Sequence, residues 1–284
     1  MAQIDTVLKT YQSNFDTDKI NIEVQKIFNL KYQSEDTSEY IKLCLSCLDY
    51  TKLTSSDTNL NVRKFVSDLL NIQIQNNFQV AGVCVYPNFI NIVNKTLGNN
   101  TNIKRVCVCG NFPSSQTFSE VKHLECQMAI KNGATEIDVV VNIGDVFEGN
   151  YQKVYDELRA IRKTCKEVKL KVILETGELQ DPQLITNTAI TAMYAGCDFI
   201  KTSTGKSKIS ATPTAAYIMC QAIKQYQAKT GNIVGIKIAG GVSSTENALR
   251  YVCIIKEILG KPWLTPSHFR IGSSSLLEKL LKDL

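Results

Sequence analysis

The chain has 284 residues, of which 44% are hydrophobic and 21% charged, the composition of an ordinary soluble domain with a sizeable core. The net charge of +5 is modest and is not gathered into a basic run, so nucleic acid is not an expected partner. Residues 1–12 contain no apolar run, and no stretch of about eighteen apolar residues occurs, so we expect a cytoplasmic protein without a signal peptide or membrane partner.

The ten cysteines are expected to be reduced and buried, because the chain carries no secretory signal. Cys44 and Cys47 have CxxC spacing, but they fall in a predicted strand, which disfavours redox chemistry. His123 and Cys126 lie in a helical stretch without a second pair of ligands, which disfavours a zinc site. We therefore expect neither a metal nor another cofactor.

The first 40 residues are predicted to form a helical extension packed on the remaining domain, residues 41–284. A helix over Asp18–Leu30 follows from the spacing of Ile20, Val24 and Ile27. Beyond it, short apolar strands alternate with amphipathic helices. The eight predicted strands are Leu43–Tyr50, Val80–Tyr86, Arg105–Cys109, Glu136–Asn142, Leu170–Thr176, Phe199–Ser203, Val234–Ala239 and Phe269–Gly272. The helices between them are Val62–Asn76, Glu120–Asn132, Gln152–Lys166, Pro182–Tyr194, Pro213–Ala228 and Thr245–Leu259.

This alternation predicts an α/β fold with parallel strands. Eight units favour a closed (β/α)8 TIM barrel over an open doubly wound sheet. In such a barrel the chemistry gathers where the strands end, so polar residues in the second half of a strand are the candidates for function.

Lys201 is the first candidate, because it interrupts the apolar strand Phe199–Ser203. Lysine is rarely buried without a partner, and burial usually lowers its pKa. Lys237 lies on the inward face of the next strand, so the two amines are expected to lie within several ångströms of each other. Lowering a lysine pKa from about 10.4 to roughly 7 requires on the order of 4.6 kcal/mol, which a like charge and partial desolvation can supply.

Two carboxylates are further candidates. Asp138 faces inward on the fourth strand, where it could orient a lysine or move protons, and a purely structural ion pair remains the alternative. Asp49 and Thr51 share one face of the first strand with the same ambiguity. Cys84 is expected to pack rather than to react.

Three loops after late strands are rich in glycine and serine, and they suit an anion because glycine lets the backbone approach a ligand. Glycine turns without a ligand are the alternative interpretation. Gly205-Lys206-Ser207 resembles the end of a P-loop, but Ile200 occupies the position of its first glycine, which argues against nucleotide binding. The loops contain Gly205 and Lys206, Gly240 and Gly241, and Ser274 and Ser275.

Five motifs together resemble the deoxyribose-phosphate aldolase family. They are Phe199-Ile-Lys-Thr-Ser-Thr-Gly-Lys206, Gly235-Ile-Lys-Ile-Ala-Gly-Gly241, Glu136-Ile-Asp-Val-Val140, Val83-Cys-Val-Tyr-Pro87 and Phe269-Arg-Ile-Gly-Ser-Ser-Ser-Leu276. The resemblance implies a metal-free aldolase that reversibly splits 2-deoxy-D-ribose 5-phosphate into D-glyceraldehyde 3-phosphate and acetaldehyde. The C-terminal tyrosine of some members has no counterpart in Leu281-Lys-Asp-Leu284, and the match is weakest before about Tyr40.

The resemblance also implies roles for individual residues. Lys201 matches the Schiff-base lysine, Lys237 the second lysine and Asp138 the proton-relay aspartate. The phosphate positions fall on Gly205, Lys206, Gly240, Gly241, Ser274 and Ser275, and Cys84, Asp49 and Thr51 fall near the sugar. A phosphosugar is therefore the expected partner, and a homodimer is a hypothesis that the sequence leaves open. A Schiff-base aldolase for another phosphosugar and a non-catalytic phosphosugar-binding barrel are the alternatives.

Overall fold

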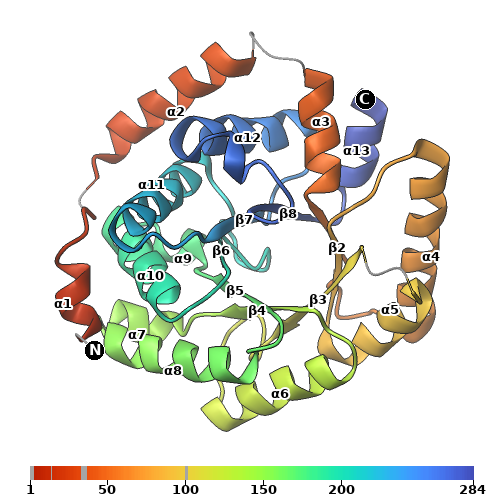
Figure 1. Cartoon of the computed structure of the whole chain (residues 1–284), viewed down its shortest axis with the longest axis horizontal. Helices are drawn as coiled ribbons and strands as arrows, with labels where there is room; N and C mark the ends of the chain where they lie inside the picture. Colours follow the sequence, from red (N-terminus) through yellow and green to blue (C-terminus); the bar gives the residue numbers. More distant parts are fainter. Residues whose placement is uncertain (1–2, 14, 33–36, 100–101) are drawn as a thin grey trace.

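The computed structural model describes residues 3–13, 15–32, 37–99 and 102–284, and its eight strands close into one parallel barrel in chain order (Figure 1). This confirms the predicted TIM barrel. The strands are β1 Leu48–Thr51, β2 Gly82–Val85, β3 Lys104–Cys109, β4 Glu136–Val140, β5 Lys169–Ile173, β6 Phe199–Lys201, β7 Gly235–Ala239 and β8 Phe269–Ser273.

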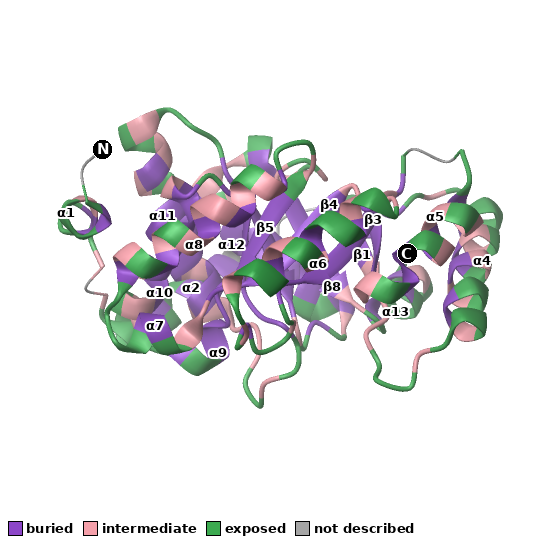
Figure 2. Ribbon diagram, turned by 90° about the horizontal axis from the view of Figure 1, so that it is seen from below, coloured by how far each residue is buried: buried purple, intermediate pink, exposed green. Residues whose placement is uncertain are grey.

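Helices surround the barrel and bury its outer face (Figure 2). All six predicted helices occur, within a few residues of their predicted ends. In the described residues the helices are α1 Ile4–Leu8, α2 Thr17–Tyr32, α3 Thr37–Ser46, α4 Asn59–Asn76, α5 Ile90–Leu97, α6 Ser119–Lys131, α7 Ile143–Phe147, α8 Tyr151–Thr164, α9 Thr176–Leu179, α10 Pro182–Tyr194, α11 Pro213–Thr230, α12 Thr245–Leu259 and α13 Leu276–Asp283, with 3-10 turns η1 Pro87–Phe89 and η2 Lys261–Trp263.

The helix ends follow local sequence signals. Thr58 caps α4 in a reciprocal capping box with Asn61, and the helix ends at Asn77 in the left-handed conformation. Asp181 caps α10 by accepting two backbone N–H groups, and Pro182 occupies the first helical position, where its missing N–H costs nothing. Such caps set the lengths of the helices and therefore the loops that reach the barrel mouth.

Two predicted strand boundaries are wrong by three residues or more. Residues 43–46 belong to the last turn of α3, and β1 begins only at Leu48, so Cys44 lies in a helix and Cys47 in the turn after it. A short apolar run fits a buried helix as well as a strand, which explains the error. The fifth predicted strand is too long, because β5 ends at Ile173 and the chain turns at Glu175.

The N-terminal helices pack on the outside of the barrel helices (Figure 1). Helix α1 contacts α8 and α10, and α2 lies across α11 and α12. The Tyr11 hydroxyl, between α1 and α2, lies 3.0 Å from that of Tyr194 on α10. The predicted helix Asp18–Leu30 lies within α2. In the described part of the chain, no helix is both long and apolar enough to span a membrane.

The apolar core lies between the strands and the helices, whereas the barrel interior is largely polar. Isoleucine and valine at alternate strand positions face the helices, and charged side chains at the intervening positions face the barrel axis. Cys84, Val106, Val108 and Phe199 are apolar exceptions inside the barrel. A Cβ on Gly235 would lie 2.4 Å from the Phe199 ring, so the ring requires glycine at that position of β7.

Candidate active site

The two predicted lysines lie side by side inside the barrel. Lys201 on β6 and Lys237 on β7 are direct partners in the parallel strand register, so their amines reach the same height. Both side chains are almost completely buried. Lys201 Nζ and Lys237 Nζ lie 2.9 and 2.8 Å from the same oxygen, Oδ2 of Asp138 on β4. The structure thus brings together the three residues predicted to do the chemistry.

Three charged residues that the sequence pattern did not single out complete this cluster. Lys171 on β5 donates to Asp138 Oδ1 at 2.9 Å and contacts Glu136 Oε2 at 2.6 Å. Arg270 on β8 donates to both oxygens of Glu136 and, at 2.6 Å, to Asp49 Oδ1. Strand alternation could have identified Lys171, because Leu170 and Val172 beside it face the helices.

The cluster contains one more cation than it has carboxylates. Its cations are Lys171, Lys201, Lys237 and Arg270, and its carboxylates are Asp49, Glu136 and Asp138. An uncompensated charge in a buried site is costly, so loss of one proton from one lysine balances the cluster. Lys201 is the best placed to lose it, because among the described residues its one ionic partner is an oxygen that Lys237 also contacts.

The pKa values of the two lysines are shifted in opposite directions. Burial lowers the pKa of the Lys201 amine below its ordinary value, the Asp138 carboxylate opposes this, and the charge of Lys237 lowers the pKa further. For Lys237 burial also acts downward, but Asp138 and Asp49 outweigh it and raise its pKa. Burial therefore contributes more to the lowered pKa of Lys201 than the like charge does.

The carboxylates are held in the ionised state. Burial alone would raise the pKa of Asp138, but the charges of Lys171, Lys201 and Lys237 hold it well below its ordinary value. For Asp49, Lys237 and Arg270 likewise outweigh burial and lower the pKa. Asp49 also accepts a hydrogen bond of 2.5 Å from Lys237.

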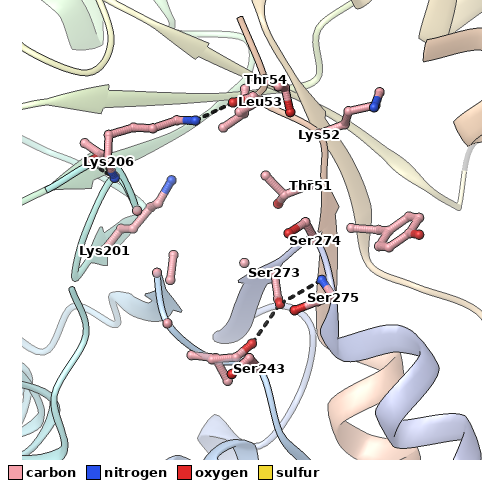
Figure 3. A pocket seen from close by; sticks show the side chains of 18 of the residues that line it. Thr51, Lys52, Leu53, Thr54, Lys201, Lys206, Ser243, Ser273, Ser274 and Ser275 are labelled. Atoms are coloured by element: carbon pink, nitrogen blue, oxygen red, sulfur yellow. Dashed lines mark hydrogen bonds between the residues drawn. The ribbon is translucent and has the colours of Figure 1, made fainter. Parts of the chain in front are cut away.

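A cavity of ≈ 520 Å³ opens above Lys201 at the carboxyl ends of the strands (Figure 3). All six residues of the predicted anion loops line it, together with Thr51. Ser243 and Ser273 also line it and were not predicted. The full lining is Tyr50, Thr51, Lys52, Leu53, Thr54, Phe65, Lys201, Thr204, Gly205, Lys206, Ala239, Gly240, Gly241, Val242, Ser243, Gly272, Ser273, Ser274 and Ser275.

Two loops at the rim touch each other through glycine. Gly205 and Gly240 have φ values of 78° and 83°, which favour glycine. A Cβ on Gly240 would lie 2.7 Å from Ser210 Oγ and 3.1 Å from the Gly205 Cα, so no larger residue fits between the loops. The backbone therefore forms this wall of the cavity and can approach a ligand closely.

A serine cap shapes the third loop. The Ser273 hydroxyl donates to the Val242 carbonyl at 2.7 Å and accepts from the Ser275 N–H (Figure 3). It also accepts from the Leu276 N–H. It thereby ties the start of α13 to the loop after β7. Ser274 and Ser275 remain exposed at the cavity, next to a helix N-terminus that favours a negative charge.

Lys206 crosses the mouth of the cavity. Its amine donates to the carbonyl of Leu53, in the loop after β1 (Figure 3). Lys206 is exposed, whereas Lys201 reaches into the cavity from below. A ligand held between the loops would thus meet one cation at the rim and one amine at the floor.

The remaining predicted substrate residues lie at different depths. Thr51 lines the cavity, and its hydroxyl donates to the Asp49 carbonyl at 2.7 Å. Asp49 and Cys84 are fully buried beneath the cavity lining, so contact between them and a sugar stays a prediction. Burial raises the pKa of the Cys84 thiol, which disfavours the thiolate.

Apolar side chains flank the amine of Lys201 on one side. The Phe112 ring lies with its centroid 6.0 Å from Lys201 Nζ and packs edge-on against Tyr86. Phe112, Tyr86 and Leu53 cover a small cluster of Cys84, Val106 and Val108. Of these side chains Leu53 lines the cavity, and the others pack beneath it beside the amine.

A polar barrel interior with a buried amine of lowered pKa beneath the cavity fits the class that the comparison of families shows, a (β/α)8-barrel aldolase. The family model of the DeoC/LacD family aldolase matches residues 44–276, and the chain belongs to this family. This confirms the resemblance seen in the sequence.

Named relatives cover most of the chain. Human deoxyribose-phosphate aldolase is 37% identical over 263 residues, covering 89% of this chain and 83% of its own. The mouse deoxyribose-phosphate aldolase is 38% identical over 263 residues, which again cover 89% of this chain and 83% of the mouse protein. The tetrameric deoxyribose phosphate aldolase from Aeropyrum pernix shares the fold, with a TM-score of 0.71 at 24% identity over 91% of this chain and 97% of that one.

Proposed function

We propose that the protein reversibly cleaves 2-deoxy-D-ribose 5-phosphate to D-glyceraldehyde 3-phosphate and acetaldehyde through a Schiff base on Lys201, in the catabolism of deoxyribose phosphate. The observation that carries the proposal is the position of Lys201, an amine of lowered pKa at the floor of a cavity whose rim suits a phosphate. The names of the human and mouse relatives support the choice of substrate.

In the proposed reaction, neutral Lys201 attacks the C1 aldehyde of the open-chain sugar, and loss of water gives a protonated imine. Asp138, acting through a water, takes the proton of the C3 hydroxyl. The C2–C3 bond then breaks, its electron pair neutralises the iminium as an enamine, and glyceraldehyde 3-phosphate leaves. Protonation of the enamine at C2 and hydrolysis release acetaldehyde and restore Lys201.

The charge balance of the barrel supports this sequence of steps. A neutral Lys201 leaves the six other charged groups of the cluster in three opposite pairs, and the imine later restores one positive charge at the same place. Lys237 stays protonated because Asp49 and Asp138 raise its pKa, so it keeps a positive charge next to Lys201. The proposed role of Lys237 is therefore electrostatic.

The proposed phosphate site is the rim formed by Gly205, Lys206, Gly240, Gly241, Ser274 and Ser275. Binding there would anchor the distal end of the substrate and orient the reacting carbon toward Lys201. To bind the phosphate, Lys206 would exchange the Leu53 carbonyl for a charged acceptor, which is a stronger hydrogen-bond partner.

The test is incubation of the purified protein with 2-deoxyribose 5-phosphate, with assays for both products, and reduction of the mixture with borohydride. We expect acetaldehyde and glyceraldehyde 3-phosphate in equal amounts and an ethyl group on Lys201 by mass spectrometry. In the reverse direction, aldol addition with dihydroxyacetone or its phosphate as the donor in place of acetaldehyde would favour an aldolase of other specificity. Binding of the sugar without cleavage would favour a non-catalytic barrel.

A further inference from the structure

The turn after β5 interlocks with the loop after β6, which carries Lys206. Glu175 in this turn is 2% exposed and adopts the left-handed conformation, with φ 56° and ψ 57°. The Thr176 N–H donates to the Thr202 carbonyl at 2.9 Å. A Cβ on Gly177 would lie 1.9 Å from the Ile209 carbonyl oxygen, so these two backbones touch. The two loops are therefore held together at several points.

Glu175 differs from the other buried acids that the structure describes. Those acids, Asp49, Glu136, Asp138 and Asp145, each form an ion pair with a lysine or arginine. Within the described chain, Glu175 has no such partner. Its carboxylate instead accepts from the Thr204 N–H at 3.2 Å and from the Thr204 hydroxyl at 2.5 Å. The role of this acid therefore lies in what it does to Thr204.

The direction of these hydrogen bonds orders the next two residues. The Thr204 hydroxyl donates its single hydrogen to Glu175 Oε2. The Thr204 oxygen is then free to accept the Lys206 N–H, at 3.0 Å. In the described residues the Gly205 N–H has no acceptor, and Gly205 lines the cavity. Glu175 thus determines which backbone donor of the loop remains available to a ligand.

We infer that Glu175 is a positioning residue for the phosphate of the substrate. Through Thr204 it fixes the loop so that the Gly205 N–H and the Lys206 side chain face the cavity. Glu175 itself does not line the cavity. The inference rests on the proposed function, because it assigns the phosphate to this loop.

The test is Glu175→Gln in the full-length chain, with steady-state kinetics on 2-deoxyribose 5-phosphate and on unphosphorylated 2-deoxyribose. The Gln amide has one acceptor oxygen, whereas the carboxylate has two. It therefore cannot accept from the Thr204 N–H and the Thr204 hydroxyl on separate oxygens, and the loop should lose its fixed conformation. We expect KM for the phosphorylated sugar to rise about tenfold, the size of one lost hydrogen bond to a charged group. Turnover of unphosphorylated deoxyribose should not change. An equal loss on both sugars, or an unchanged KM, would overturn the inference.

Matched variants separate positioning from stability. Glu178→Gln removes an exposed carboxylate from the same turn and should leave both sugars unaffected. Thr204→Val replaces the hydroxyl with a methyl group of similar size, which removes both hydrogen bonds of this oxygen. It should reproduce the effect of Glu175→Gln, also where the latter does not fold. Thr204→Ser keeps the hydroxyl, so its KM for the phosphorylated sugar should rise less than that of Thr204→Val. The losses in the double variant Glu175→Gln/Thr204→Val should not add, because both changes disturb the same contact between Glu175 and Thr204; additive losses would contradict the inference.

The wild-type protein distinguishes this inference from the proposed function. If it cleaves deoxyribose 5-phosphate with a lower KM than deoxyribose, the phosphate site holds, and the Glu175 variants decide the inference alone. If it cleaves both sugars with the same KM, the phosphate site itself fails and the inference fails with it. If it cleaves neither sugar, the proposed function is wrong.

Discussion

Lys201 and Lys237 are direct partners across the pairing of β6 and β7, and their amines lie 2.9 and 2.8 Å from one oxygen of Asp138. One carboxylate oxygen thus faces two amines. In the part of the chain that the structure describes, Lys237 has a second carboxylate, Asp49, within hydrogen-bond distance and Lys201 has none. This asymmetry explains why two neighbouring lysines have pKa values shifted in opposite directions. It also assigns them different proposed roles.

Lys201→Arg should abolish cleavage, because a guanidinium stays protonated and cannot attack an aldehyde. We expect turnover of deoxyribose 5-phosphate to fall by ~10³-fold or more. Borohydride reduction in the presence of substrate should leave no adduct, as measured by mass spectrometry of the intact protein. An adduct that survives on this variant would refute Lys201 as the nucleophile.

Lys237→Leu should move the pH profile of activity to higher pH. Loss of the neighbouring charge, together with an Asp138 oxygen left to Lys201 alone, raises the pKa of Lys201. We expect the apparent pKa that governs kcat/KM to increase by about one or more. Lys237→Arg keeps the charge and is the control. A residually active Lys237→Leu protein with an unchanged profile would contradict the electrostatic role.

Asp138→Asn should separate imine formation from bond cleavage. The amide keeps the shape of the side chain but cannot take the proton of the C3 hydroxyl. We expect kcat for deoxyribose 5-phosphate to fall by ~10²–10⁴-fold. When acetaldehyde is added to the variant directly, borohydride should still trap it on Lys201. Thermal unfolding should show a lower Tm, because Lys171 loses one of its carboxylates. Cleavage at the wild-type rate would remove Asp138 from the proton transfer.

Ser274→Asp should weaken binding of the phosphorylated sugar, because it places a negative charge at the cavity rim. We expect KM for deoxyribose 5-phosphate to rise by about tenfold or more, since like charges at short range cost on the order of 1–4 kcal/mol. Ser274→Asn has a similar size without the charge and should have a smaller effect. An unchanged KM in Ser274→Asp would move the phosphate to another part of the cavity.

Acid should destabilise the protein through Asp49 and Asp138. Burial would raise both pKa values, but the neighbouring cations lower them below the ordinary value, so in acid the unfolded chain binds protons first. The stability that these carboxylates confer is complete above about pH 4 and is lost as the pH falls toward their folded pKa values. In that range the free energy of unfolding falls by up to about 1.4 kcal/mol per pH unit for each carboxylate. Urea unfolding between neutral pH and about pH 3 measures this, and a flat profile below pH 4 would contradict it.

Strand alternation was sufficient to place Lys201, Lys237 and Asp138 on the inward face, because a period of two needs only the local sequence. Strand alternation was not sufficient to predict which charged residues pair with them inside the barrel. Asp49 and Arg270 pair across 221 positions, and this contact exists only because β1 pairs with β8. Glu136 opens its strand, where polar residues are common, so its position carries no local signal.

Glu175 marks another limit of prediction from the sequence. The apolar run Leu170–Leu174 predicts a strand, and a strand would simply extend through Glu175 and Thr176. The observed left-handed turn costs roughly 1–2 kcal/mol and is held by contacts with the loop after β6, 29 residues away. Tertiary contacts of this kind decide the local conformation, so a single-sequence pattern does not predict them.

The pairing of β1 with β8 also completes the charged surroundings of Lys201. Asp49 and Arg270 meet only when the first and last strands join. Without Asp49, the ammonium group of Lys237 has one carboxylate fewer to accept its hydrogen bonds. In the unfolded chain Lys201 is surrounded by water, where a lysine amine has its ordinary pKa. The lowered pKa of Lys201, and with it the proposed role of this amine, therefore depends on the closed barrel.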